Sequence, residues 1–183
     1  KHHEGFCLWD SKYTDYDVAN SGNKTDVIEA VAKECKKQGV RLGLYYSLWD
    51  RKVDPDVNNP AGDAAYNEYM INQLNELIDI TEKHTDLVEF WSDGSWVKPG
   101  YRWPLKEIYK TIKSREKQCQ IGINWTIGSP DNLNANVLPT DQKEGYPIRF
   151  FPSDFRLGDP HLPGNPDPKL FSNEGETYYM PWE

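Results

Sequence analysis

Two periodicities alternate along the chain and predict strands and helices in turn. Short apolar runs indicate buried strands at residues 40–46, 87–92 and 121–125. A further strand is expected to end near His3, and a short one lies at 148–151. Apolar residues at helical spacing predict helices at residues 26–38, 63–83 and 104–118.

This strand–helix alternation requires parallel strands joined by helical crossovers. Polar and aromatic residues gather after the strands, which is typical of an α/β barrel or a doubly wound sheet. No glycine-rich phosphate fingerprint follows a strand, so a nucleotide-binding sheet is disfavoured. A complete barrel needs about 250 residues, and the chain has 183. We therefore expect the α/β class, with 1–183 as one truncated interior part of a (β/α)8 TIM-like barrel and 126–183 as its irregular Pro-, Asn- and Asp-rich loop region.

The run LVEFWSDGSW at residues 87–96 is the most informative stretch. Its apolar half predicts a strand that stops at Asp93, where Asp-Gly signals a turn. Since strand side chains alternate, Trp91 and Asp93 are expected to point the same way. Asp93 then either caps the turn or is a reacting carboxylate beside an indole, as barrel enzymes present to a sugar.

Composition narrows the classes of partner. Aromatic residues make up 13% of the chain, with seven Trp and eleven Tyr; they form either a large core or stacking surfaces for sugar rings. The net charge is −8, and the scattered basic residues argue against a nucleic-acid partner. No apolar run approaches the ~20 residues of a membrane span. The three cysteines are too few and too dispersed for a disulfide framework or a zinc site.

The pair His2-His3 is the second candidate for chemistry. It is interpreted as surface or hydrogen-bonded structure, or as part of a site. A metal pair is disfavoured, because adjacent strand residues point to opposite faces and no third ligand is evident. We therefore predict no metal site at this pair.

Four strings together resemble a known family: KHHEGFCLW at 1–9, GLYYS at 43–47, WSDG at 91–94 and WE at 182–183. They are similar to the α-L-fucosidases of glycoside hydrolase family 29, and the first string is the most specific. The resemblance implies a catalytic barrel that releases α-L-fucose from fucosylated glycans with retention. It also favours a secreted or periplasmic protein, and it implies no oligomeric state. The alternatives are a related barrel hydrolase of fucose-containing polysaccharides and a carbohydrate-binding barrel without catalysis.

The resemblance also implies residue roles. Asp93 corresponds to the nucleophile. The residues that correspond to substrate-binding positions are His2, His3, Tyr46, Trp91 and Arg156. Glu183 corresponds to the acid/base, with Glu174 and Glu176 as rivals. A retaining glycosidase needs two such carboxyl groups about 5–5.5 Å apart. It requires no metal and no organic cofactor, so the resemblance implies neither.

Overall fold

The computed structural model describes residues 1–56, 58, 63–98 and 101–124, with three short strand segments at 149–151, 172–173 and 176–177. Its elements follow in chain order: α1 (Val27–Gln38), β1 (Leu42–Ser47), α2 (Ala64–Thr81), β2 (Leu87–Asp93), η1 (Ser95–Val97), α3 (Leu105–Arg115), β3 (Gln120–Asn124), β4 (Arg149–Phe151), β5 (Ser172–Asn173) and β6 (Glu176–Thr177). No helix among these residues is long and apolar enough to cross a membrane.

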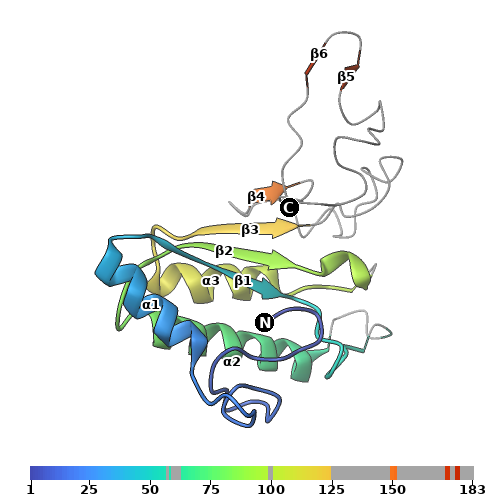
Figure 1. The fold of residues 1–183 in the computed structure, drawn as a ribbon. Coiled ribbons are helices and arrows are strands. Elements are labelled where there is room, and N and C mark those ends of the chain that lie inside the picture. The colour runs from blue at the N-terminus through green and yellow to red at the C-terminus, as the bar shows by residue number, and fades with distance from the viewer. Residues whose placement is uncertain are drawn as a thin grey trace.

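The strands β1 to β4 form one sheet in chain order, and every neighbouring pair is parallel. Figure 1 shows α1, α2 and α3 on one side of this sheet. The predicted parallel pairing of strands 40–46 and 87–92 is therefore confirmed, as is the α/β class. The short strands β5 and β6 pair antiparallel in a separate sheet.

Local sequence signals set the helix ends. Asp26 and Asp63 cap α1 and α2, each accepting a hydrogen bond from a backbone N–H three residues ahead. Gly39 ends α1 in the left-handed conformation at φ 67°, which glycine adopts without strain. The third helix stops at Arg115 rather than at residue 118, because Glu116 leaves the helical conformation.

The core lies between the sheet and its helices, and α2 contributes most to it. The stripe of α2 that helical spacing brings to one side is buried, and it consists of Tyr66, Met70, Leu74, Leu77, Ile78 and Thr81. The same helix also buries Gln73 and Glu76. Glu76 ties down the N-terminal loop by accepting hydrogen bonds from Trp9 Nε1, Ser11 Oγ and the Lys12 N–H.

The prediction that a strand ends near His3 is wrong. Residues 1–6 contain a turn instead, in which the Gly5 N–H donates to the His2 carbonyl at 3.1 Å. The Ser47 N–H donates to the Lys1 carbonyl at 3.1 Å, so the turn lies beside the carboxyl end of β1 (Figure 1). Parallel strands present their carboxyl ends at one edge, and the turn therefore joins the edge that carries Asp93.

Candidate active site

Asp93 is the last residue of β2, and only 4% of its surface is exposed. Its backbone carbonyl accepts a hydrogen bond of 2.7 Å from the Leu48 N–H, which ties the ends of β1 and β2 together. Its side-chain Oδ2 accepts a hydrogen bond of 2.5 Å from the Tyr45 hydroxyl. A rigid strand end thus fixes the backbone of this carboxylate, and a phenol fixes its side chain.

The two histidines come together at this carboxylate. The rings of His2 and His3 lie 4.1 Å apart, and His3 Nε2 lies 3.7 Å from Asp93 Oδ2. The expectation of opposite faces is wrong, because these residues occupy a turn rather than a strand. The Arg51 N–H donates to the His3 carbonyl at 2.8 Å and fixes the turn from its other side.

Burial, with the charge of His2 adding to it, lowers the pKa of His3 to about 4. The ring is therefore neutral at neutral pH, and its approach to Asp93 is not an ion pair. Its Nδ1 lies 2.6 Å from Ser47 Oγ. His2 Nδ1 lies 3.1 Å from Glu4 Oε2 in an exposed contact. For Glu4, hydrogen bonds from its own backbone and from His2 outweigh burial and hold the pKa below its usual value.

Gly94 follows Asp93 and packs closely against the side chains of His3 and Ser47. Its φ of 78° lies in the left-handed region. A Cβ at this position would lie 2.9 Å from Ser47 Oγ and 3.1 Å from both Cε1 and Nδ1 of His3. The turn after β2 therefore needs glycine both for its backbone conformation and for the close approach of two side chains.

Tyr46 does not join this site, and its neighbour Tyr45 does. Tyr46 is fully buried and donates a hydrogen bond of 2.8 Å to Gln73 of α2. Burial raises its pKa well above the usual value. The register pairs Ser47 with Asp93, so alternation puts Tyr45 and Ser47 on the face that carries Asp93 and puts Tyr46 on the helix face. The alternation of side chains would have predicted Tyr45 as the site residue if the register of β1 and β2 had been known from the sequence.

Trp91 is half-buried and pairs with Tyr45 across the two strands. It stands two residues before Asp93 on β2, so both side chains belong to the same face of the strand. The sequence-based expectation for this pair therefore agrees with the register of the sheet.

A buried ion pair supports the histidine turn. Lys1 Nζ lies 2.7 Å from Asp50 Oδ2, and both side chains are fully buried. The Tyr69 hydroxyl donates to the same oxygen at 2.9 Å. Burial alone would raise the pKa of Asp50, but the charge and hydrogen bond of Lys1 outweigh it and hold that pKa below its usual value. The sequence pattern gave no sign of this pairing, because the two partners are 49 residues apart.

Three groups in the described part of the chain lie close enough together to hold a metal ion. One ligand atom each from His2, His3 and Asp93 falls within 4.8 Å of the others. The same atoms suit a sugar, because two imidazoles and a carboxylate offer acceptors to several hydroxyls. The prediction that the protein uses no metal stays a prediction.

Several expected site residues lie outside the described residues. Arg156, Glu174 and Glu183 belong to this group, as does most of the loop region 126–183. Glu176 is described only as the first residue of β6. Their expected roles therefore stay predictions.

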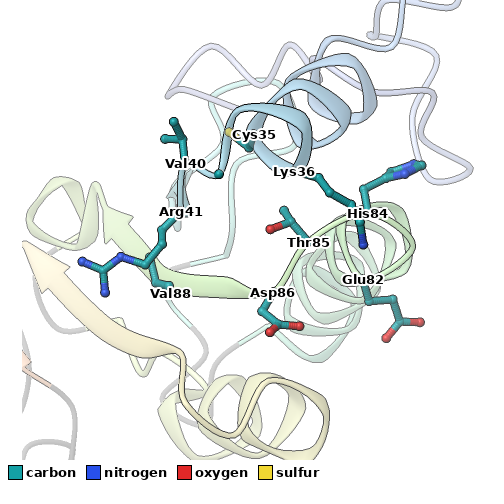
Figure 2. A pocket seen from close by; sticks show the side chains of 10 residues that line it. Cys35, Lys36, Val40, Arg41, Glu82, His84, Thr85, Asp86 and Val88 are labelled. Atoms are coloured by element: carbon teal, nitrogen blue, oxygen red, sulfur yellow. The ribbon is translucent and has the colours of Figure 1, made fainter.

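A cavity of about 420 Å³ lies at the opposite edge of the sheet, where β1 and β2 begin. Figure 2 shows its lining, which comes from the end of α1 and the segments leading into the two strands and includes Cys35, Arg41, His84 and Asp86. Barrel enzymes place their chemistry at the carboxyl ends of the strands. The cluster around Asp93 is therefore the better candidate.

A parallel α/β sheet with a carboxylate and two imidazoles at its carboxyl edge is the kind of site found in barrel enzymes. Comparison with known sequences identifies the family. The alpha-L-fucosidase family model matches residues 1–146, and the chain belongs to that family. Alpha-L-fucosidase 1 of Arabidopsis thaliana is 40% identical over 98 residues, which cover 52% of this chain and 18% of the relative.

Solved structures agree with this assignment. An alpha-L-fucosidase of Bacteroides thetaiotaomicron trapped as a covalent intermediate is 29% identical with a TM-score of 0.56; the match covers 67% of this chain and 29% of that one. The Thermotoga maritima alpha-fucosidase in complex with fucose is 25% identical with a TM-score of 0.52, and the shares are 70% and 34%. The chain thus spans about a third or less of these relatives.

Proposed function

We propose that the protein of which this chain is part is a retaining exo-α-L-fucosidase acting on fucosylated glycans. The observation that carries this proposal is the convergence of His2, His3 and Tyr45 on the Asp93 carboxylate at a strand end. The trapped intermediate of the Bacteroides relative supports a covalent mechanism. We also propose that the four-stranded sheet is part of an eight-stranded barrel with the site at its carboxyl face.

Asp93 is the nucleophile in this proposal. Its carboxylate attacks the anomeric carbon, the bond to the leaving oxygen breaks, and a fucosyl ester forms. The Tyr45 hydroxyl holds one carboxylate oxygen at 2.5 Å and orients the group for attack. His2 and His3 bind sugar hydroxyls, and Trp91 offers an apolar wall to the methyl group of fucose.

Glu183 is the proposed acid/base, with Glu174 and Glu176 as rivals, and Arg156 is a proposed substrate contact. The acid must protonate the leaving oxygen and then take a proton from the water that hydrolyses the ester. A raised pKa suits the first of these steps.

The test is made on the full-length protein with an aryl α-L-fucoside and a natural glycan. Asp93→Gly is expected to lower kcat by at least about 10⁴-fold on both substrates. Glu183→Ala is expected to impair natural linkages more than aryl fucosides, because activated leaving groups need less proton donation. Azide should then yield a fucosyl azide of retained configuration from the Glu183 variant and of inverted configuration from the Asp93 variant.

Two outcomes would redirect the proposal. Wild-type turnover of natural linkages by the Glu183 variant would pass the acid/base role to Glu174 or Glu176. Fucose binding without any hydrolysis by the wild-type protein would favour a carbohydrate-binding barrel.

A further inference from the structure

The hydroxyl of Ser47 lies between the His3 ring and the backbone of Trp49. Its Oγ lies 2.5 Å from the Trp49 carbonyl oxygen and 2.6 Å from His3 Nδ1. A carbonyl only accepts hydrogen bonds, and a hydroxyl has one proton, so Ser47 donates to Trp49. Ser47 therefore accepts its second hydrogen bond, and His3 Nδ1 must be the donor. In a neutral imidazole this leaves the lone pair on Nε2.

The surrounding backbone keeps Ser47 in this arrangement. It ends β1, is fully buried, and donates its own N–H to the Lys1 carbonyl at 3.1 Å. The backbone of Gly94 closes the remaining side, since even a Cβ there would lie 2.9 Å from Ser47 Oγ and 3.1 Å from the His3 ring. Ser47 Oγ and the His3 ring are therefore both packed against the backbone of Gly94.

The lone pair on His3 Nε2 lies 3.7 Å from Asp93 Oδ2, itself an acceptor. This part of the site therefore offers acceptors on both sides. On the basis of the proposed function, we propose that Ser47 is a positioning residue that fixes the His3 tautomer, so that the sugar hydroxyl at His3 must donate its proton and analogues without that proton are rejected.

His2 follows the same pattern in a weaker form. Its Nδ1 lies 3.1 Å from the Glu4 carboxylate, which when ionised only accepts hydrogen bonds. The Nδ1 of His2 is therefore also a donor. Because this contact is exposed to solvent, it holds the tautomer less firmly than the buried serine does.

The first experiment reads the tautomer directly, by ¹⁵N NMR of the full-length protein with labelled histidine. The wild-type His3 signal, identified by its loss in His3→Gln, is expected to show a protonated Nδ1 and an unprotonated Nε2. In Ser47→Ala the signal should move toward a mixture of tautomers, whereas Ser114→Ala should leave it unchanged, since Ser114 is an exposed residue of α3 whose hydroxyl donates to the Thr111 carbonyl of the same helix. A wild-type His3 protonated on Nε2 overturns the proposal.

The second experiment measures the affinity of fucose analogues in which each non-anomeric hydroxyl is replaced in turn by hydrogen or fluorine. At the hydroxyl facing His3 the wild-type protein should bind both analogues about a hundredfold more weakly than fucose, with fluorine no better than hydrogen. In Ser47→Ala the fluorinated analogue should gain relative to the deoxy analogue, because Nε2–H can then donate to fluorine. A purely structural role of Ser47 would weaken all analogues alike and would overturn the proposal.

The two experiments separate this inference from the proposed function. If the wild-type protein binds no fucose but shows the expected His3 tautomer, the fucosidase proposal fails, whereas the inference that Ser47 fixes this tautomer stands. In the converse case, fucose binds and is hydrolysed while, at every position, the fluorinated analogue binds the wild-type protein more tightly than the deoxy analogue. The fucosidase proposal then stands, and the inference about Ser47 fails. Ser47→Ala should also lower kcat/KM by about tenfold.

Discussion

Replacing Gly94 with Ala tests how tightly the turn after β2 constrains the site. At a φ of 78° an L residue loses about 1–2 kcal/mol to backbone strain. The new Cβ also meets Ser47 Oγ at 2.9 Å and His3 ring atoms at 3.1 Å. Pushing these groups aside costs about 1–3 kcal/mol more. We therefore expect Gly94→Ala to lower the free energy of unfolding by about 2–5 kcal/mol.

Activity should fall more steeply than stability suggests. The added methyl group moves His3 and Ser47 away from Asp93, and a displacement of about 1 Å at a reacting group costs about a hundredfold in rate. Urea unfolding and kcat/KM on an aryl α-L-fucoside, both on the full-length protein, measure the two effects. The activity is compared well below the unfolding temperature of each variant.

Two glycines of this chain are matched controls. Gly39 has a φ of 67° but no atom within 4 Å of its Cβ position, so Gly39→Ala introduces backbone strain without a steric clash. Gly22 has open space and no positive φ, so Gly22→Ala should change stability by less than about 1 kcal/mol. Both should keep wild-type kcat/KM. Equal kcat/KM for Gly94→Ala and Gly39→Ala would refute the reasoning.

The remaining predictions concern the strand faces, the thiols and metal dependence. Tyr45→Phe should lower kcat about tenfold by removing the hydrogen bond to Asp93, the proposed nucleophile, whereas Tyr46→Phe should lower the free energy of unfolding by about 1–3 kcal/mol with unchanged kcat/KM; the reverse result would contradict the register. Iodoacetamide should label half-buried Cys35 and spare Cys7 and Cys119, whose pKa values burial raises to about 12. Between pH 9 and 12 the thiols of the unfolded chain ionise while Cys7 and Cys119 in the folded protein stay protonated. Each of the two should therefore lower the free energy of unfolding by about 1.4 kcal/mol per pH unit. Urea unfolding at several pH values measures this slope, and a slope that Cys119→Ala leaves unchanged would contradict the prediction. Dialysis against EDTA should leave turnover unchanged, and a loss restored by Zn²⁺ would show a metal-dependent site.

Periodicity predicted most of the described fold because its causes are local. The inner stripe of α2, including Met70 and Leu74, follows from helical spacing alone. Capping by Asp26 and Asp63 depends on a side chain and a backbone N–H three residues ahead. Because a helix follows each of the first two strands, the next strand returns in the same direction, and neighbouring strands therefore pair in parallel.

The composition of the site was harder to predict because it depends on register and on a turn. Asp93 and Trp91 follow from one strand, but choosing between Tyr45 and Tyr46 requires knowing which residue of β1 lies opposite Asp93. His2 and His3 share a site only because the chain turns there, and strand alternation predicted the opposite. Ser47 belongs to the string GLYYS, but the sequence did not indicate its role, since that role depends on a contact with His3, which is distant in the sequence.

The string KHHEGF works as one structural unit, and this explains why it carries the resemblance so specifically. Lys1 places its ammonium 4.8 Å and 4.9 Å from the ring centres of Tyr46 and Tyr69 and pairs with buried Asp50. A Cβ on Gly5 would lie 2.3 Å from Asp50 Oδ1, so glycine is needed for the turn to reach this anchor. A buried ion pair adds little net stability, and we infer that it fixes the turn in one position. The lysine and glycine therefore determine where the two imidazoles lie relative to Asp93.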